Sequence, residues 1–166
     1  SETEEMEKIV VNGAALKKNL AIITLKDVPD KPGIAAEIFH ELAAANIVID
    51  DIIQTRTTPG KATISFTVEL SDLPKARTLC RRICKKLDGA TVEFEKNLAK
   101  VSVVGLGMRV HTGVAEKMFA ALAQAGINIR NITTSEIKIS CIIDRTQGAK
   151  ALRVVHDAFK LGGKKS

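Results

Sequence analysis

Few residues of this sequence have the types and spacing that covalent chemistry needs. The three histidines, His40, His111 and His156, have no paired carboxylate and no serine or cysteine signature around them. Gly105 and Gly107 follow a strand-like run, but a dinucleotide-binding loop would need a third glycine where Val110 stands. No Gly-x-x-x-x-Gly-Lys-Ser/Thr phosphate loop is present either. We therefore expect no catalytic residue, no cofactor and no enzyme activity in this chain.

Metal binding is the next chemistry to consider. Cys80 and Cys84 stand four residues apart and could share a metal ion on one helix face, but no further ligand lies near them in sequence. Free cysteine is often buried in protein cores, so we expect both thiols in a core and no metal site. Three cysteines, an odd number, do not indicate a disulfide framework.

Binding of a small polar ligand fits the sequence better. Asp30 precedes a predicted helix, where its carboxylate either caps a turn or meets the ammonium of a zwitterion whose carboxylate reaches helix-start N–H groups. Gln54, on the following strand, could hydrogen-bond a polar ligand side chain. Asn128 is an amide amid apolar alternation; because a buried amide needs partners, we rank it above Asp30. His111, in a later loop of the chain, could line a site.

The elements that must position these residues occur twice. Residues 32–52 (PGIAAEIFHELAAANIVIDDI) and 112–132 (TGVAEKMFAALAQAGINIRNI) match at a constant offset of 80 residues, as Gly33 and Gly113 or Phe39 and Phe119 show. A constant offset with matching residue classes indicates a duplicated unit. In each copy, apolar residues fall first at helical spacing and then alternate, which predicts a helix followed by a half-buried strand.

The whole chain is predicted to be two β-α-β-β-α-β units, the ferredoxin-like order. A turn or short connection is expected over Gly13 to Asn19, with Lys17 and Lys18 exposed, and a hairpin turn over Thr57 to Gly60. Strands are expected at 8–12, 20–26, 47–56, 62–70, 90–95, 100–105, 127–134 and 136–143. Helices are expected at 34–45, from Leu73-Pro74 to Gly89, at 114–125 and at about 147–160.

The two copies differ at their ends. The second copy lacks a last strand, whereas the apolar run at residues 8–12 has no place in the first. Since an unpaired sheet edge is a liability, we expect Ile9–Val11 to complete the second sheet. The predicted fold class is α+β, with two tandem ferredoxin-like domains. The first, residues 20–96, is inserted into the second, which is formed by residues 6–19 and 97–163.

Composition and charge bear on which classes of partner the chain can bind. The net charge is +6, which could indicate nucleic acid, but the chain has no Trp or Tyr and only five Phe, so stacking platforms are missing. No apolar run approaches the roughly 20 residues that span a bilayer, and the acidic N-terminus is unlike a signal peptide. We expect a cytoplasmic chain that binds neither nucleic acid nor membrane. The basic residues are interpreted as a solvated helix face: Arg77, Arg81, Arg82, Lys85 and Lys86.

These motifs resemble a known family. Two tandem β-α-β-β-α-β units with an Asp-x-Pro-Gly loop, here Asp30 to Gly33, resemble ACT domains, which bind amino acids and regulate enzymes. The stretches VSVVGLGM (101–108), GINI (126–129) and TTSEIKIS (133–140) closely resemble the C-terminal regulatory region of aspartokinase. So does VNGAALKKN, near the family's junction with the kinase domain. The resemblance covers about residues 6–163.

The resemblance implies feedback control. Aspartokinase phosphorylates the side-chain carboxylate of aspartate on the route to lysine, threonine and methionine, and its regulatory region binds threonine, lysine or both. The implied partners are such an effector, of which we favour threonine, a second copy in a homodimer, and the aspartokinase catalytic domain or alpha subunit. Met6 lies where an internal start of a separate beta subunit could be. The alternative is a stand-alone ACT-pair sensor that regulates another enzyme or transcription.

The resemblance also implies the site. In that family, effectors lie between the first unit of one chain and the second unit of its partner. A possible second site lies in the equivalent loop, which departs from the family in having Thr112 where a proline matching Pro32 is common. The matching positions of the first site are Asp30, Lys31, Pro32, Gly33, Ile34, Ala35, Gln54 and Ser65 with Asn128, Ile129 and Ser135; those of the second are Met108, Val110, His111, Thr112, Gly113, Val114 and Ala115.

Overall fold

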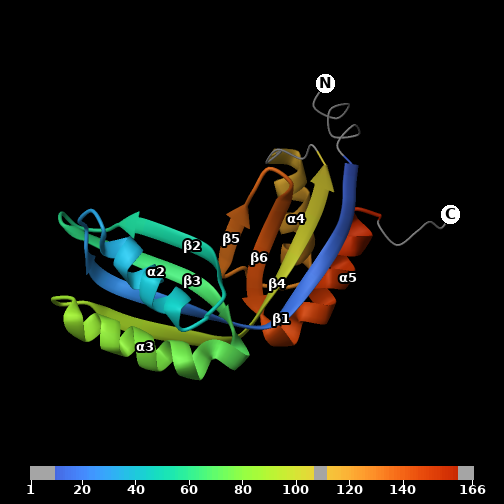
Figure 1. The fold of residues 1–166 in the computed structure, drawn as a ribbon. Coiled ribbons are helices and arrows are strands. Elements are labelled where there is room, and N and C mark those ends of the chain that lie inside the picture. Colours follow the sequence, from blue (N-terminus) through green and yellow to red (C-terminus); the bar gives the residue numbers. More distant parts are fainter. Residues whose placement is uncertain (1–9, 107–111, 161–166) are drawn as a thin grey trace. The chain divides into compact units, whose positions relative to one another are not determined.

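The computed structural model describes residues 10–106 and 112–160 (Figure 1). The chain divides into two compact units, one formed by residues 19–97 and the other by residues 1–18 and 98–166. We call them the inserted unit and the split unit. The α+β class predicted from the sequence is confirmed, since each unit combines strands with two helices. Within the described ranges, no helix has the length and apolar character to cross a membrane.

The inserted unit follows the β-α-β-β-α-β order. Its strands lie in the sheet order β2-β3-β1-β4, and β3 is antiparallel to both β1 and β2. Helices α2 and α3 cover one face of these strands (Figure 1). The elements are the second half of β1 (Val10–Pro29), α2 (Ile34–Ala44), β2 (Ile49–Arg56), β3 (Lys61–Glu69), a 3-10 turn (Leu70–Asp72), α3 (Leu73–Lys86) and the first half of β4 (Thr91–Leu106).

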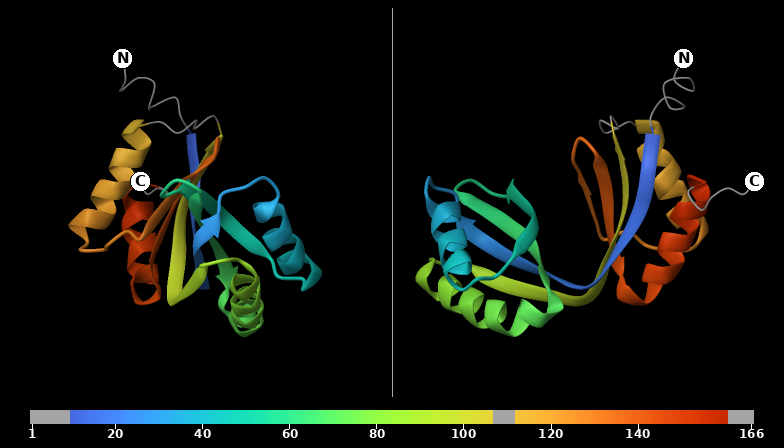
Figure 2. Two further views of the ribbon diagram at one scale, coloured as in Figure 1. Left: turned by 90° about the vertical axis from the view of Figure 1, so that its left-hand side faces the viewer. Right: turned by 45° about the vertical axis from the view of Figure 1, so that its right-hand side comes forward.

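The split unit has the same arrangement of elements. The N-terminal part of β1 takes the place that the last strand has in the inserted unit. The sheet order is β1-β4-β6-β5, with β6 antiparallel to β4 and β5. Figure 2 shows α4 and α5 on one face of these strands. Val10 and Val11 of the predicted edge segment lie in β1, and Ile9 lies outside the described residues. The further elements are α4 (Thr112–Gln124), β5 (Asn131–Thr134), β6 (Lys138–Asp144), a 3-10 turn (Arg145–Gln147) and α5 (Gly148–Ala158).

Two predicted breaks in the chain are wrong. Residues 13–19 are not a turn, because β1 runs without interruption from Val10 to Pro29. Ala14 and Leu16 pack against the core of the split unit while Ala15 and Lys17 are exposed, so the segment alternates as a strand does. Likewise β4 joins the predicted strands 90–95 and 100–105 into one. The strands that were expected to begin at residues 47 and 127 start later, at Ile49 and Asn131.

Left-handed residues mark the places where these long strands pass from one unit to the other. Asn19 in β1 and Asn97 in β4 have φ of 63° and 64°, and they stand at the two unit boundaries. Asparagine tolerates this conformation better than most residues. At each boundary, one left-handed residue within a continuous strand therefore stands where the sequence suggested a connecting loop.

Each unit has its own core on the helix-covered face of its strands. In α3 the predicted apolar face is confirmed, with Ala76, Leu79, Cys80, Ile83 and Cys84 buried and Leu87 packed beside them. Burial raises the pKa of Cys80 and of Cys141 to about 12, so both thiols stay protonated.

Candidate functional site

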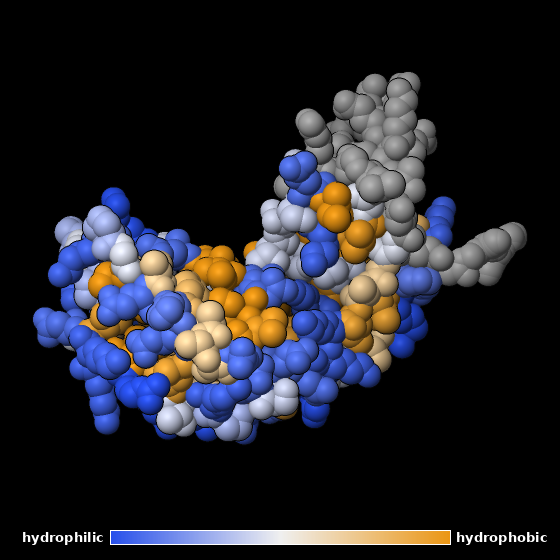
Figure 3. Space-filling model, in the orientation of Figure 1, coloured by the Kyte–Doolittle hydropathy of each residue, from blue (hydrophilic) through white to orange (hydrophobic). Residues whose placement is uncertain are grey.

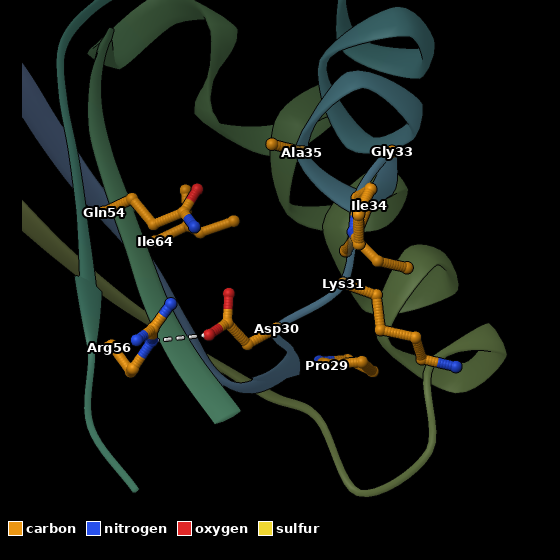
Figure 4. A pocket seen from close by; sticks show the side chains of 10 residues that line it. Pro29, Asp30, Lys31, Gly33, Ile34, Ala35, Gln54, Arg56 and Ile64 are labelled. Carbon is orange, nitrogen blue, oxygen red and sulfur yellow. Dashed lines mark hydrogen bonds and ion pairs between the residues drawn. The ribbon is translucent and has the colours of Figure 1, made fainter. Parts of the chain in front are cut away.

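A cavity of about 440 Å³ opens in the inserted unit between the loop that precedes α2 and the neighbouring ends of β2 and β3. Figure 4 shows side chains from the loop, from the first turn of α2 and from the strands around this space. Pockets for small ligands commonly start at about 300 Å³, so a single amino acid would fit. The lining residues are Pro29, Asp30, Lys31, Pro32, Gly33, Ile34, Ala35, Gln54, Arg56 and Ile64.

The loop presents the start of α2 to the cavity. Gly33 is the residue before the helix and has φ of +91°, a left-handed conformation that glycine adopts without strain. No side chain caps this helix start, and the first N–H groups of any helix lack intrahelical acceptors. An anion such as a carboxylate can therefore accept hydrogen bonds there.

Asp30 lies in the loop just before this helix start, lines the cavity and is paired with Arg56. The Arg56 Nε donates to Asp30 Oδ2 over 2.7 Å, which the dashed line in Figure 4 marks. Asp30 is the more enclosed partner, with 23% of its side chain exposed against 77% for Arg56. Its second carboxylate oxygen, Oδ1, has no hydrogen-bond donor among the described residues, so it can accept one from a ligand.

Strand β2 brings Gln54 and Arg56 to the same side. The two residues are two positions apart, so their side chains share one face of the strand, and both line the cavity. Gln54 pairs across the sheet with Ile64 of β3, whose apolar side chain also lines the cavity. Arg56 was not predicted from the sequence; its place two residues after Gln54 was the signal that could have found it.

Seven of the eight predicted positions in the first unit line the cavity, and Ser65 does not. Ser65 follows Ile64 on β3, and successive side chains of a strand point to opposite faces. Ile64 lies on the buried face that packs against the helices, which leaves Ser65 on the other face, opposite Thr24 of β1. The register of β3 therefore separates Ser65 from the described cavity.

The three predicted residues of the second unit lie in the split unit and line none of this cavity. Asn128 is exposed, so the expectation of a buried amide is wrong; it precedes β5, where no strand pairing holds it. Ile129 is half-buried and packs against the split unit's core. Ser135 is exposed at the β5–β6 connection, where its N–H donates to the Lys138 carbonyl over 2.8 Å and its Oγ accepts from Ile137 N–H.

The possible second site is only partly described. Thr112 and Gly113 open α4, and Ala115 packs against the core of the split unit. Val114 is 2% exposed and belongs to that core, which leaves its side chain little access to a ligand. Met108, Val110 and His111 lie outside the described residues. Within the described ranges, no group of three His, Cys, Asp or Glu residues could hold a metal ion.

Family models and solved structures match this architecture. Models described as ACT domain match residues 22–85 and 101–159. One chain in the crystal structure of aspartokinase alpha and beta subunits is 44% identical, with a TM-score of 0.81; the match covers 92% of this chain and 100% of that one. The ligand-free regulatory subunit of aspartate kinase from Thermus thermophilus is 40% identical, with a TM-score of 0.81 and coverage of 90% and 98%.

Curated relatives are longer than this chain. The aspartokinase of Helicobacter pylori is 42% identical over 158 residues, which are 95% of this chain but 38% of that protein. The chain thus spans about two fifths of the length of such relatives, whereas it covers 98% of the regulatory subunit from Thermus thermophilus. The resemblance seen in the sequence motifs is confirmed. The chain belongs to the aspartokinase family and corresponds to its regulatory region of two ACT domains.

Proposed function

We propose that the chain binds an end-product amino acid, threonine or lysine, and thereby feedback-inhibits aspartate phosphorylation by an aspartokinase catalytic domain or alpha subunit. The cavity of the inserted unit carries this proposal, because it combines a carboxylate, an uncapped helix start and an amide within one small space. The ligand's carboxylate accepts from the N–H groups at the start of α2, and its ammonium donates to Asp30 Oδ1. Gln54 hydrogen-bonds a polar group of its side chain.

Coupling to a catalyst requires that the ligand change an equilibrium between two assemblies. We infer a homodimer in which exposed sheet edges pair and the ligand stabilises one geometry. Two observations support it: β2 and β5 end the strand order, and each carries an exposed isoleucine, Ile52 (53%) and Ile132 (46%). Figure 3 shows apolar side chains at the surface of the inserted unit among hydrophilic ones. Coupling energies of roughly 1–3 kcal/mol are typical of allosteric proteins.

Isothermal titration tests the proposal directly. Threonine, lysine and a panel of other amino acids are titrated at millimolar concentration into the purified chain. Saturable heat with threonine or lysine, lost when Asp30 is replaced by asparagine, is the expected result. Absence of heat with every amino acid would overturn the proposal. The regulatory step is then measured as loss of threonine-dependent inhibition of aspartate phosphorylation when the same variant is combined with the catalytic partner.

A further inference from the structure

The charges that line the cavity are unequal. Asp30 is the one carboxylate among the lining residues, whereas Lys31 and Arg56 are cations. In Figure 4 the Lys31 side chain runs away from Asp30 and Gln54, while the guanidinium of Arg56 lies beside Asp30. The cation that a bound ligand meets is therefore Arg56.

The same geometry limits what Asp30 can offer. Its Oδ2 accepts from Arg56 Nε over 2.7 Å, so one carboxylate oxygen is already occupied. The α-ammonium of an amino acid can use Oδ1. A second ammonium, at the end of the ligand's side chain, would find no further carboxylate among the lining residues and would lie near a guanidinium instead. Like charges held at short distance disfavour such a complex.

We propose that Arg56 is a specificity-determining residue that makes this cavity prefer amino acids with an uncharged side chain over those with a cationic one. The inference rests on the proposed function, because it presumes that the cavity binds an amino acid. Arg56 disfavours a cationic ligand side chain in two ways. Its charge repels a cationic side chain, and its hydrogen bond withdraws Asp30 Oδ2 from that side chain.

The size of the effect follows from exposure. The side chain of Arg56 is 77% exposed, so water and salt screen part of its field. We expect a discrimination of about fivefold in Kd, since exposed charge pairs act at about this level. Raising the salt concentration should reduce this difference in Kd.

The test compares lysine with an uncharged amino acid that has the same carbon chain. Isothermal titration measures Kd for threonine, lysine and norleucine, an uncharged amino acid with the carbon chain of lysine. The wild-type chain should bind norleucine about fivefold more tightly than lysine. Arg56→Gln should bring this ratio to about one by gaining lysine affinity. Arg56→Glu should reverse it, because a carboxylate would then face the ligand's second ammonium.

Two further variants separate charge from other causes. Arg56→Lys keeps the charge and should keep the ratio. Arg82→Gln removes one exposed positive charge from α3, away from the cavity lining, and should leave every Kd unchanged. Circular dichroism checks that the variants are folded.

Each contrary result contradicts either the inference about Arg56 alone or the proposed function as well. Wild-type lysine affinity equal to or above that of norleucine overturns the inference while leaving amino-acid binding intact. An unchanged ratio in Arg56→Gln, or Arg56→Lys behaving as Arg56→Gln does, overturns it as well. If no amino acid gives heat with the wild-type chain, the proposed function fails and the inference falls with it.

Discussion

The N–H of Asp30 donates to the carbonyl of Gly60 over 2.9 Å, which ties the loop before α2 to the turn between β2 and β3. The two residues are 30 positions apart in sequence, and the loop that carries Asp30 lines the cavity. The ion pair between Arg56 and Asp30 adds a side-chain link from the same loop to the end of β2. A change that moves the loop will therefore also move the strand that carries Gln54 and Arg56.

The left-handed backbone at Gly33 gives the first prediction. An alanine there would meet no atom within 4 Å, so its effect comes from backbone strain at φ +91° and not from a clash. Gly33→Ala should lower the free energy of unfolding by about 1–2 kcal/mol and weaken threonine binding, because the strain is relieved by shifting the loop. Urea unfolding and titration measure the two effects. Gly13→Ala, also in open space but without positive φ, should leave threonine binding unchanged and should not lower the free energy of unfolding; equal losses in both variants would refute the strain argument.

The small side chain of Ala35 gives the second prediction. Ala35 lines the cavity at the first turn of α2 and is half-buried, whereas its neighbour Ala36 is exposed and outside the lining. Ala35→Leu should fill space that the ligand needs and raise the Kd for threonine about tenfold or more, a change of about 1.4 kcal/mol. Ala36→Leu adds the same atoms on the solvent side and should leave the Kd as it is. Undiminished threonine affinity in Ala35→Leu would place the effector elsewhere.

Local patterns in the sequence were enough to predict most of the fold. The apolar stripe of Ile38 and Leu42 defined α2, and the face from Ala76 to Cys84 defined α3, because helical periodicity is carried by neighbouring residues. The loop from Asp30 to Gly33 was predicted from its turn residues and lies at the cavity. The continuity of β1 was missed because Gly13 and Asn19 are common in turns, yet both lie in the strand.

The missed parts of the site depend on distant contacts. Asp30 and Arg56 are 26 positions apart, and no local pattern says which of many cations will reach a given carboxylate. Asn128 was interpreted as buried because it stands between Ile127 and Ile129, but the strand begins only at Asn131. Ser65 was placed at the site by resemblance, whereas the register of β3 turns it from the described cavity.

Buried hydroxyls in the split unit give the third prediction. Ser102 of β4 and Ser140 of β6 are directly opposite in the sheet, with their Oγ atoms 2.7 Å apart and both residues buried. Ser102→Ala would leave Ser140 Oγ without this partner and should destabilise the fold by about 1–2 kcal/mol. The double alanine variant should be less destabilised than the sum of the two single variants. Additive losses in urea unfolding would show that the hydrogen bond contributes little.

The buried thiols give the fourth prediction, which concerns pH. Burial raises the pKa of Cys80 and Cys141 to about 12, against 9.0 for an exposed thiol. Between these values the unfolded chain loses protons that the folded chain keeps, so stability is fully present below pH 9 and falls as the pH rises from about 9 to 12. The Cys141→Ser variant should show a smaller fall over this window. An aromatic disulfide reagent at pH 8 should label the thiols only after denaturation; rapid labelling of the native chain would contradict their burial.

The exposed edge of β2 gives the fifth prediction. Ile52 is 53% exposed on a strand that ends the sheet order, and a charge at that place would have to be desolvated if two edges paired. Ile52→Lys should therefore shift the proposed homodimer toward monomer by at least tenfold in dissociation constant and weaken threonine binding with it, because the ligand stabilises the paired state. Sedimentation analysis with and without threonine measures both effects. Lys75→Glu on the exposed side of α3 is the control and should leave assembly unchanged. A wild-type chain that stays monomeric at saturating threonine would exclude pairing as the route by which the effector acts.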